Sequence, residues 1–185
     1  MHKFDASRAG LLDSEERRKF LPPEDILRKI GVREDTIFAD IGCGTGYFTI
    51  PAAEMAERGN VFAIDMQEEM LEMLKEKISG KENITIVSST EDKIPLPDES
   101  VDIAFMANVL HEIDGDGTLR EAHRILRHGG ILVVVDWKKE KTEIGPPMEH
   151  RLSLKEAEFK IKGVGLSPKD SFEIQPYHYC IVANK

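Results

Sequence analysis

Cysteine is scarce in this 185-residue chain, which has only Cys43 and Cys180. Two cysteines cannot build a disulfide framework or a zinc–thiolate cluster, and His123 and His128 are spaced too poorly to share a helix face, so we predict no metal site. No apolar run approaches the ~20 residues that a membrane-spanning helix needs. The first five residues also lack the apolar segment of a secretion signal, so we expect a cytoplasmic protein.

Basic residues are outnumbered, with 25 Lys and Arg against 34 Asp and Glu, which gives a formal net charge of −9. A chain with this balance does not present a large basic face, so nucleic acid is not an expected partner. Hydrophobic residues make up 41% of the chain, which is typical of a folded protein and not of a disordered one. The length corresponds to about one domain.

Apolar stretches with the spacing of strands alternate with stretches that have helical spacing, which predicts an α/β fold with a mainly parallel sheet. A helix is expected over residues 118–127, ended by Gly129 and Gly130. The last two strands would close the sheet edge as an antiparallel hairpin. The strands are expected at residues 36–41, 61–64, 83–87, 101–106, 131–136, 170–175 and 178–184. We therefore predict a Rossmann-like, seven-stranded fold with helices on both faces, as one domain over residues 22–185.

Residues 1–21 precede this domain as a polar and basic arm that carries a few large apolar side chains. A short helix is expected within it, at residues 14–20. The arm could act as a lid over a binding site, form a contact in a homodimer, or be disordered.

A glycine-rich turn at residues 42–46 lies between the first expected strand and the following helix. Glycines at Gly42, Gly44 and Gly46 let the backbone turn tightly and let a ligand approach it closely. The second strand ends 23 residues after Gly42, at Asp65. An acid in that position can accept hydrogen bonds from both hydroxyls of a ribose, although it could also cap the next helix.

The spacing Gly-x-Gly-x-Gly differs from the Gly-x-Gly-x-x-Gly pattern of dinucleotide-binding loops. Asp40 directly precedes the turn and would repel a pyrophosphate, whereas it suits a ligand with an ammonium or sulfonium group. The site therefore favours S-adenosylmethionine over a nicotinamide dinucleotide. An oxidoreductase is further disfavoured because no tyrosine has a lysine four residues after it.

Residues 40–46 resemble motif I of the class I S-adenosylmethionine-dependent methyltransferases, and Asp65 matches their acidic ribose-binding position. The resemblance extends over about residues 36–136. Within that superfamily, residues 94–102 and 119–130 are similar to the corresponding segments of small-molecule enzymes of the quinone-biosynthesis methyltransferase type.

The resemblance implies the residues that would bind S-adenosylmethionine and its product S-adenosylhomocysteine. Asp65 would bind the ribose and Met66 would lie against the adenine. Thr90 and Glu91 stand where the family often has an Asp-Ala pair that meets the adenine, and Asn108 would lie between the methionine part and the substrate. The methionine end would be held by Asp40, Gly42, Gly44 and Gly46. Cys43 in the same loop would also bind the cofactor, and Tyr47 would pack beside it.

His111 follows the fourth expected strand, at the carboxyl edge of the sheet where such folds bind ligands. An imidazole with an ordinary pKa near 6.5 can remove a proton from an acceptor, so His111 is the candidate catalytic base; the alternative is a surface histidine or a polar contact at a helix end. Trp137 is expected either in the core or in the wall of the acceptor pocket. His150 and Arg151 belong either to a lid or to a solvated loop.

The expected function is methyl transfer to a small-molecule acceptor by in-line displacement. The sequence has no Asn-Pro-Pro-Tyr or Asp-Pro-Pro-Tyr after the fourth strand, which disfavours methylation of nucleic-acid bases. A protein acceptor and a non-catalytic module that binds S-adenosylmethionine are the open alternatives.

Overall fold

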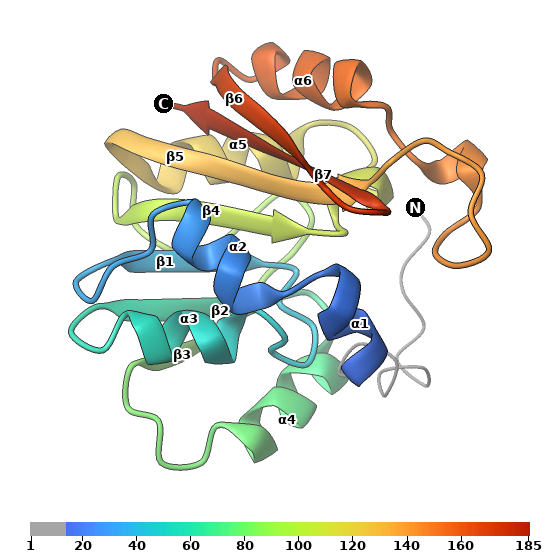
Figure 1. The fold of residues 1–185 in the computed structure, drawn as a ribbon. Coiled ribbons are helices and arrows are strands. Elements are labelled where there is room, and N and C mark those ends of the chain that lie inside the picture. The colour runs from blue at the N-terminus through green and yellow to red at the C-terminus, as the bar shows by residue number, and fades with distance from the viewer. Residues whose placement is uncertain (1–13) are drawn as a thin grey trace.

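Seven strands form one sheet in the part of the chain that the computed structural model describes, residues 14–185 (Figure 1). Their spatial order is β3-β2-β1-β4-β5-β7-β6. The strands β1 to β5 run parallel, and β7 is antiparallel to both β5 and β6. The predicted fold class is confirmed. The strands are β1 (Ile37–Ile41), β2 (Asn60–Asp65), β3 (Ile84–Ser88), β4 (Val101–Ala107), β5 (Leu126–Trp137), β6 (Ser167–Ile174) and β7 (His178–Asn184).

Helices cover both faces of the sheet because the buried strands alternate their apolar side chains between two clusters. The helices α2 and α3 pack on the face that carries Phe38 and Phe105, and α4 packs beside them on β2. The opposite face, with Ala104 and Val134, is covered by α5 and α6. The helices are α1 (Glu15–Phe20), α2 (Pro23–Lys29), α3 (Thr49–Met55), α4 (Glu68–Lys77), α5 (Gly117–Ile125) and α6 (Leu154–Gly163), with 3-10 turns η2 (Leu110–Glu112) and η3 (Met148–His150).

The strand order reverses between β1 and β4, which lie side by side although β2 and β3 separate them in sequence. In parallel sheets a crevice opens at such a reversal, beyond the carboxyl ends of the strands. The glycine loop after β1, Asp65 at the end of β2 and η2 after β4 all stand at this edge. The fold therefore brings the candidate cofactor residues and His111 to one side of the sheet.

The expected helix over residues 118–127 is wrong at its end, because α5 stops at Ile125 and β5 begins at Leu126. Gly129 and Gly130 do not cap a helix. They lie inside β5, where the register with β4 shifts between the pairs Val101–Leu126 and Ile103–Ile131. A Cβ atom on Gly130 would stand 3.0 Å from the carbonyl oxygen of Asp102, so glycine permits the close approach of the two strands there.

The short helix expected within the N-terminal arm is confirmed as α1. The side chain of Ser14 accepts a hydrogen bond from the backbone N–H of Arg17 and caps it. No residue of α1 is buried, whereas Leu21 immediately after it is completely buried. The rest of the arm, residues 1–13, lies outside the described residues.

Candidate active site

The glycine loop folds back on the end of β2, where the backbone N–H groups of Gly42 and Cys43 both donate to the carbonyl oxygen of Ile64, at 2.8 and 3.0 Å. Gly42, Gly44 and Gly46 have φ angles of 74°, 53° and 94°, in the left-handed region that side chains disfavour. The turn that the sequence predicts therefore requires glycine at all three positions.

Two of these glycines also leave no room for a side chain. A Cβ atom on Gly42 would approach a methyl group of Val109 to 2.4 Å, and one on Gly46 would approach a methyl group of Leu74 to 2.4 Å. The loop is thus packed between the segment that follows β4 and helix α4.

Asp65 is 93% buried and fixes the loop through both carboxylate oxygens. Oδ2 accepts a hydrogen bond from the backbone N–H of Gly44 at 2.9 Å, and Oδ1 accepts one from that of Gln67 at 2.9 Å. The second of these bonds reaches Gln67, which is itself the N-cap residue of α4, so the alternative that Asp65 caps this helix is wrong. A carboxylate offers about four lone-pair positions, so both oxygens can still accept from ribose hydroxyls.

Asp40 is almost completely buried at the end of β1, and the hydroxyl of Thr49 in α3 donates to its Oδ2 at 2.6 Å. Burial raises the pKa of Asp40 to about 7, helped by the nearby charge of Asp65 and opposed by the bond from Thr49. A cationic ligand at this position would stabilise the ionised carboxylate. The environment therefore matches an ammonium or sulfonium group better than a pyrophosphate.

Two buried oxygen atoms at the same edge have no hydrogen-bond partner among the described residues: Oε1 of Glu91 and Oδ1 of Asn108. Asn108 ends β4 with a φ of 61°, which is uncommon outside glycine and is held by a bond from its backbone N–H to Val135. Orphaned buried acceptors are costly unless a ligand donates to them. S-adenosylmethionine carries donors at its adenine amine and its ammonium group, so the residues present fit this cofactor.

The other predicted cofactor residues differ in their surroundings. Thr90 is exposed and Met66 is partly buried. Cys43 is buried, which raises the pKa of its thiol well above the ordinary value and leaves it unreactive. Tyr47 turns its hydroxyl toward the connection from α1 to α2, where it donates to the carbonyl of Leu21 at 2.7 Å. For all these residues, contact with the cofactor stays a prediction.

His111 is held by Asp136, the last acid of β5, through two hydrogen bonds. The ring atom Nδ1 lies 2.7 Å from Oδ1 of Asp136, and the backbone N–H of His111 donates to Oδ2 at 3.0 Å. Asp136 is completely buried and also accepts from the backbone N–H of Trp137 at 2.7 Å. When Nδ1 carries the proton it donates to the carboxylate, and Nε2 has the free lone pair of a base.

Burial lowers the pKa of His111, but the charge and hydrogen bond of Asp136 outweigh it, so the pKa stands above its ordinary value. Only 6% of the side chain is exposed. His111 is therefore not a surface histidine, but its bonds from η2 to Asp136 also agree with the alternative of a polar contact at a helix end. The pairing can hold the ring in one orientation and stabilise the imidazolium that forms when it takes a proton.

The segment from Lys138 to Arg151 packs over the end of β5. Gly145 lies so close to Trp137 that a Cβ atom there would be 2.8 Å from the indole ring. Arg151 is buried, its guanidinium lies 5.2 Å from the centre of that ring, and it forms no ion pair with a carboxylate of residues 14–185. It donates instead to five oxygens of the segment: the carbonyls of Lys138, Glu140, Ile144 and Pro146 and the hydroxyl of Thr142. Arg151 therefore holds this segment together, whereas His150 is exposed, and the choice between a lid and a solvated loop stays a prediction.

Trp137 also meets three further rings. The ring centres of Phe20, Tyr177 and His178 lie 6.3, 6.0 and 4.3 Å from its own. Trp137 is 91% buried, which agrees with the core alternative, whereas a place in the wall of the acceptor pocket stays a prediction.

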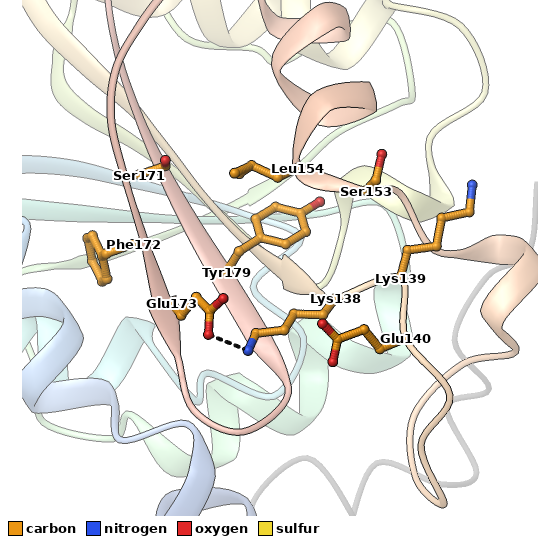
Figure 2. Close-up of a pocket in the computed structure, with 9 residues that line it drawn as sticks. All are labelled: Lys138, Lys139, Glu140, Ser153, Leu154, Ser171, Phe172, Glu173 and Tyr179. Carbon is orange, nitrogen blue, oxygen red and sulfur yellow. Dashed lines mark hydrogen bonds and ion pairs between the residues drawn. The ribbon is translucent and has the colours of Figure 1, made fainter.

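A cavity of about 280 Å³ lies outside this edge, between the β6–β7 hairpin, the start of α6 and the residues after β5. Figure 2 shows the ring of Tyr179 within it, with the ion pair between Lys138 and Glu173 on its rim. No residue expected to bind the cofactor lines it.

Sequence reasoning missed Asp136 as the partner of His111, and it missed the hydrogen bonds by which Arg151 holds the segment after β5 together. The signal for Asp136 was an acid that ends a fully apolar strand, but its partner is 25 residues away.

Within residues 14–185, no three His, Cys, Asp or Glu side chains are grouped to hold a metal ion, and no helix is long and apolar enough to cross a membrane.

Comparison with known proteins identifies relatives along most of the chain. A family model described as a methyltransferase domain matches residues 39–134. A demethylmenaquinone methyltransferase of Staphylococcus aureus is 34% identical over 113 residues, which are 60% of this chain and 47% of that protein. The chain thus matches about half the length of this relative.

Two solved structures extend the comparison. An S-adenosylmethionine-dependent methyltransferase from Aquifex aeolicus has a TM-score of 0.94 and 35% identity, and the match covers 98% of both chains. Another from Mesorhizobium loti, at 19% identity and a TM-score of 0.71 over 94% of this chain and 100% of that one, shares the fold alone.

Proposed function

Because the chain belongs to the methyltransferase domain family, whose cofactor is S-adenosylmethionine, we propose that it methylates a small aromatic acceptor with a ring hydroxyl group. The observation that carries this proposal is the placement of the His111–Asp136 pair at the same sheet edge as the Asp40–Asp65 loop. The name of the Staphylococcus aureus relative supports a quinol-type acceptor.

When bound, S-adenosylmethionine supplies a methyl group on a sulfonium centre, which is transferred by in-line displacement. Asp65 would hold the ribose, Asp40 would face the cationic end, and Glu91 and Asn108 would accept from donors of the cofactor. His111 would take the proton of the acceptor hydroxyl at Nε2, while Asp136 stabilises the resulting imidazolium. Loss of that proton makes the acceptor a better nucleophile.

The proposal assigns residues 22–185 to one cofactor-binding domain and residues 1–21 to an arm that covers the acceptor. Support comes from Phe20 at the end of α1, which lies against Tyr177 with ring centres 5.2 Å apart, and from the burial of Leu21. The segment from Lys138 to Arg151 would act as a second cover, held in shape by Arg151, and would keep water from the transfer.

The test follows label from methyl-labelled S-adenosylmethionine into 1,4-dihydroxynaphthalene, without oxygen, and into an extract of the source organism. We expect label in a low-mass product with the intact protein and none with the Asp65→Ala variant. The His111→Gln variant should bind S-adenosylhomocysteine normally but turn over at least roughly a hundredfold more slowly, as is typical when a general base is lost.

Label that enters protein instead of a small molecule would overturn the acceptor class and keep the reaction. If the protein binds S-adenosylhomocysteine but moves no label to the diol or to any extract fraction, the enzymatic proposal fails and a regulatory module is the better description.

A further inference from the structure

His178 begins β7 and is completely buried. Neither of its ring nitrogens has a hydrogen-bond partner among residues 14–185. Its ring is nearly parallel to that of Phe20, with centres 5.9 Å apart and 7° between the planes, and it lies 4.3 Å from Trp137. A donor and an acceptor are therefore enclosed by aromatic rings.

Folding alone does not account for a histidine in this position. A buried polar group without a partner destabilises the native state, and a phenylalanine of similar shape would pack against the same rings without that cost. Burial, together with the nearby charges of Arg17 and Arg151, lowers the pKa of His178 to about 3. The ring is thus neutral at physiological pH and keeps one N–H donor and one acceptor nitrogen.

The location of His178 connects it to the candidate active site. In the pairing of β5 with β7, Trp137 lies opposite His178 and Asp136 lies opposite Tyr179. Side chains of paired residues share a face of the sheet, so His178 projects beside Trp137, one residue after the carboxylate that holds His111. It is a polar group without a partner at the carboxyl edge where the acceptor must reach the cofactor.

The cover over His178 is light. Phe20 belongs to the six-residue helix α1, which buries none of its residues. Moving Phe20 aside would leave the face of His178 open beside the indole of Trp137. A planar ring could then take the place of the phenyl group and preserve the stacking.

We propose that His178 binds the methyl acceptor, with its imidazole hydrogen-bonded to a hydroxyl or carbonyl group of a planar ring that replaces Phe20 beside Trp137. The inference rests on the proposed function and names the group that would select a hydroxylated ring over a plain one.

The test uses Trp137, the only tryptophan, as a fluorescent reporter of ring binding in the full chain. The wild type and the His178→Phe variant are titrated with 1,4-dihydroxynaphthalene without oxygen, and with naphthalene, which has no polar group. We expect the Kd for the diol to rise roughly tenfold in the variant, as one lost hydrogen bond implies, and the Kd for naphthalene to change less than twofold. His178→Gln, which keeps a donor and an acceptor, should recover part of the lost affinity.

The Tm distinguishes the two roles, because replacing a residue that only packs would lower it, whereas replacing a ligand-binding residue with unpaired nitrogens would raise it. His178→Phe should raise the Tm, because it removes the unpaired nitrogens. Tyr179→Phe is the matched control: its hydroxyl is also buried without a partner, but it projects from the other face of the sheet. This variant should raise the Tm and leave the Kd for the diol unchanged.

An unchanged Kd for the diol in His178→Phe, or a lower Tm with equal loss of both ligands, would make His178 a packing residue and overturn the inference. The same follows if the wild type binds neither ring. Selective binding of the diol without transfer of label would instead support the role of His178 while refuting the proposed function.

Discussion

Replacing Asp136 with asparagine tests the chemistry of the site most directly, because three N–H groups converge on its two carboxylate oxygens. Oδ1 accepts from His111 Nδ1 and from the backbone of Trp137, and Oδ2 accepts from the backbone of His111. An amide has one oxygen and one NH₂ group. In either orientation the NH₂ group of an Asp136→Asn variant faces a donor.

The better orientation keeps the oxygen toward His111 Nδ1 and Trp137. It leaves the backbone N–H of His111 unpaired, which costs about 1–3 kcal/mol, and it weakens two charge-assisted bonds by about 1 kcal/mol in total. We therefore expect the free energy of unfolding to fall by about 2–4 kcal/mol. In a domain of this size that corresponds to a Tm lowered by roughly 5–15 °C.

The pKa of His111 gives this loss a pH dependence. In the wild type, burial lowers the pKa but Asp136 raises it further, so the folded value exceeds the unfolded one. His111 then contributes stability that is present below about pH 6.5 and is lost as pH rises through the raised pKa. In the variant, burial dominates and the folded pKa falls below the unfolded value. The stability gap between the two proteins should therefore widen as the pH falls from 8 to 6.

Urea unfolding at pH 6 and pH 8 measures that gap, and the rate of methyl transfer against pH measures the same group in the active protein. The acid limb of the rate profile should move to lower pH in Asp136→Asn, and its plateau should fall because the ring is no longer oriented. The exposed Asp35 provides the control, since Asp35→Asn should change stability by less than about 0.5 kcal/mol. An equal gap at both pH values, with an unmoved acid limb, would refute the coupling.

The cofactor loop yields two further predictions. Gly46→Ala combines a φ of 94° with a contact of 2.4 Å to Leu74, so we expect a loss of about 2–5 kcal/mol in urea unfolding and no binding of S-adenosylhomocysteine by calorimetry. Gly80→Ala, with a φ of 85° and open space around it, should lose only about 1–2 kcal/mol and bind normally; equal effects of the two variants would contradict a packed loop. The pKa of Asp40 is about 7, which is about 3 units above the ordinary 3.8. Ionisation of Asp40 therefore lowers the free energy of unfolding as the pH rises from about 4 through 7, by roughly 4 kcal/mol in full. Asp40→Asn should therefore be the more stable protein at pH 8, show little difference near pH 4, and bind S-adenosylhomocysteine at least roughly tenfold more weakly; a gap that does not change with pH would count against the buried charge.

Much of the fold followed from local patterns, because each of the five parallel strands is a short, mostly apolar run separated from the next by a polar or helical stretch. The end of α5 was predicted wrongly because the two glycines that follow it do not end a helix. Paired glycines after a helical pattern are typical of a helix end, but Gly129 and Gly130 accommodate the contact between β4 and β5. That contact joins residues about 28 positions apart, so no local window contains it.

The candidate site divides in the same way. The glycine loop and Asp65 could be predicted because one βαβ unit contains both and the chemistry depends on short spacings. The partner of His111 could not, because Asp136 reaches it only after β5 has paired with β4. An acid at the end of a strand indicates the edge of the sheet on which it lies, and the side chain that it meets depends on strand order.

Buried polar atoms without partners are the feature that sequence patterns show least, and they point to the ligands most directly. A histidine such as His178 looks like any residue at the start of a strand until its burial is known. Glu91, Asn108 and His178 stand near the carboxyl ends of the strands, each with a buried atom that has no partner among residues 14–185. Since such atoms destabilise the protein alone, a ligand that pairs with them gains affinity from relieving that cost, and it stabilises the fold in proportion to its occupancy. Each ligand would supply hydrogen-bond partners to different buried atoms at the same edge of the sheet. If the acceptor also reaches Asn108, the cofactor and the acceptor together should therefore raise the Tm by more than either ligand does alone.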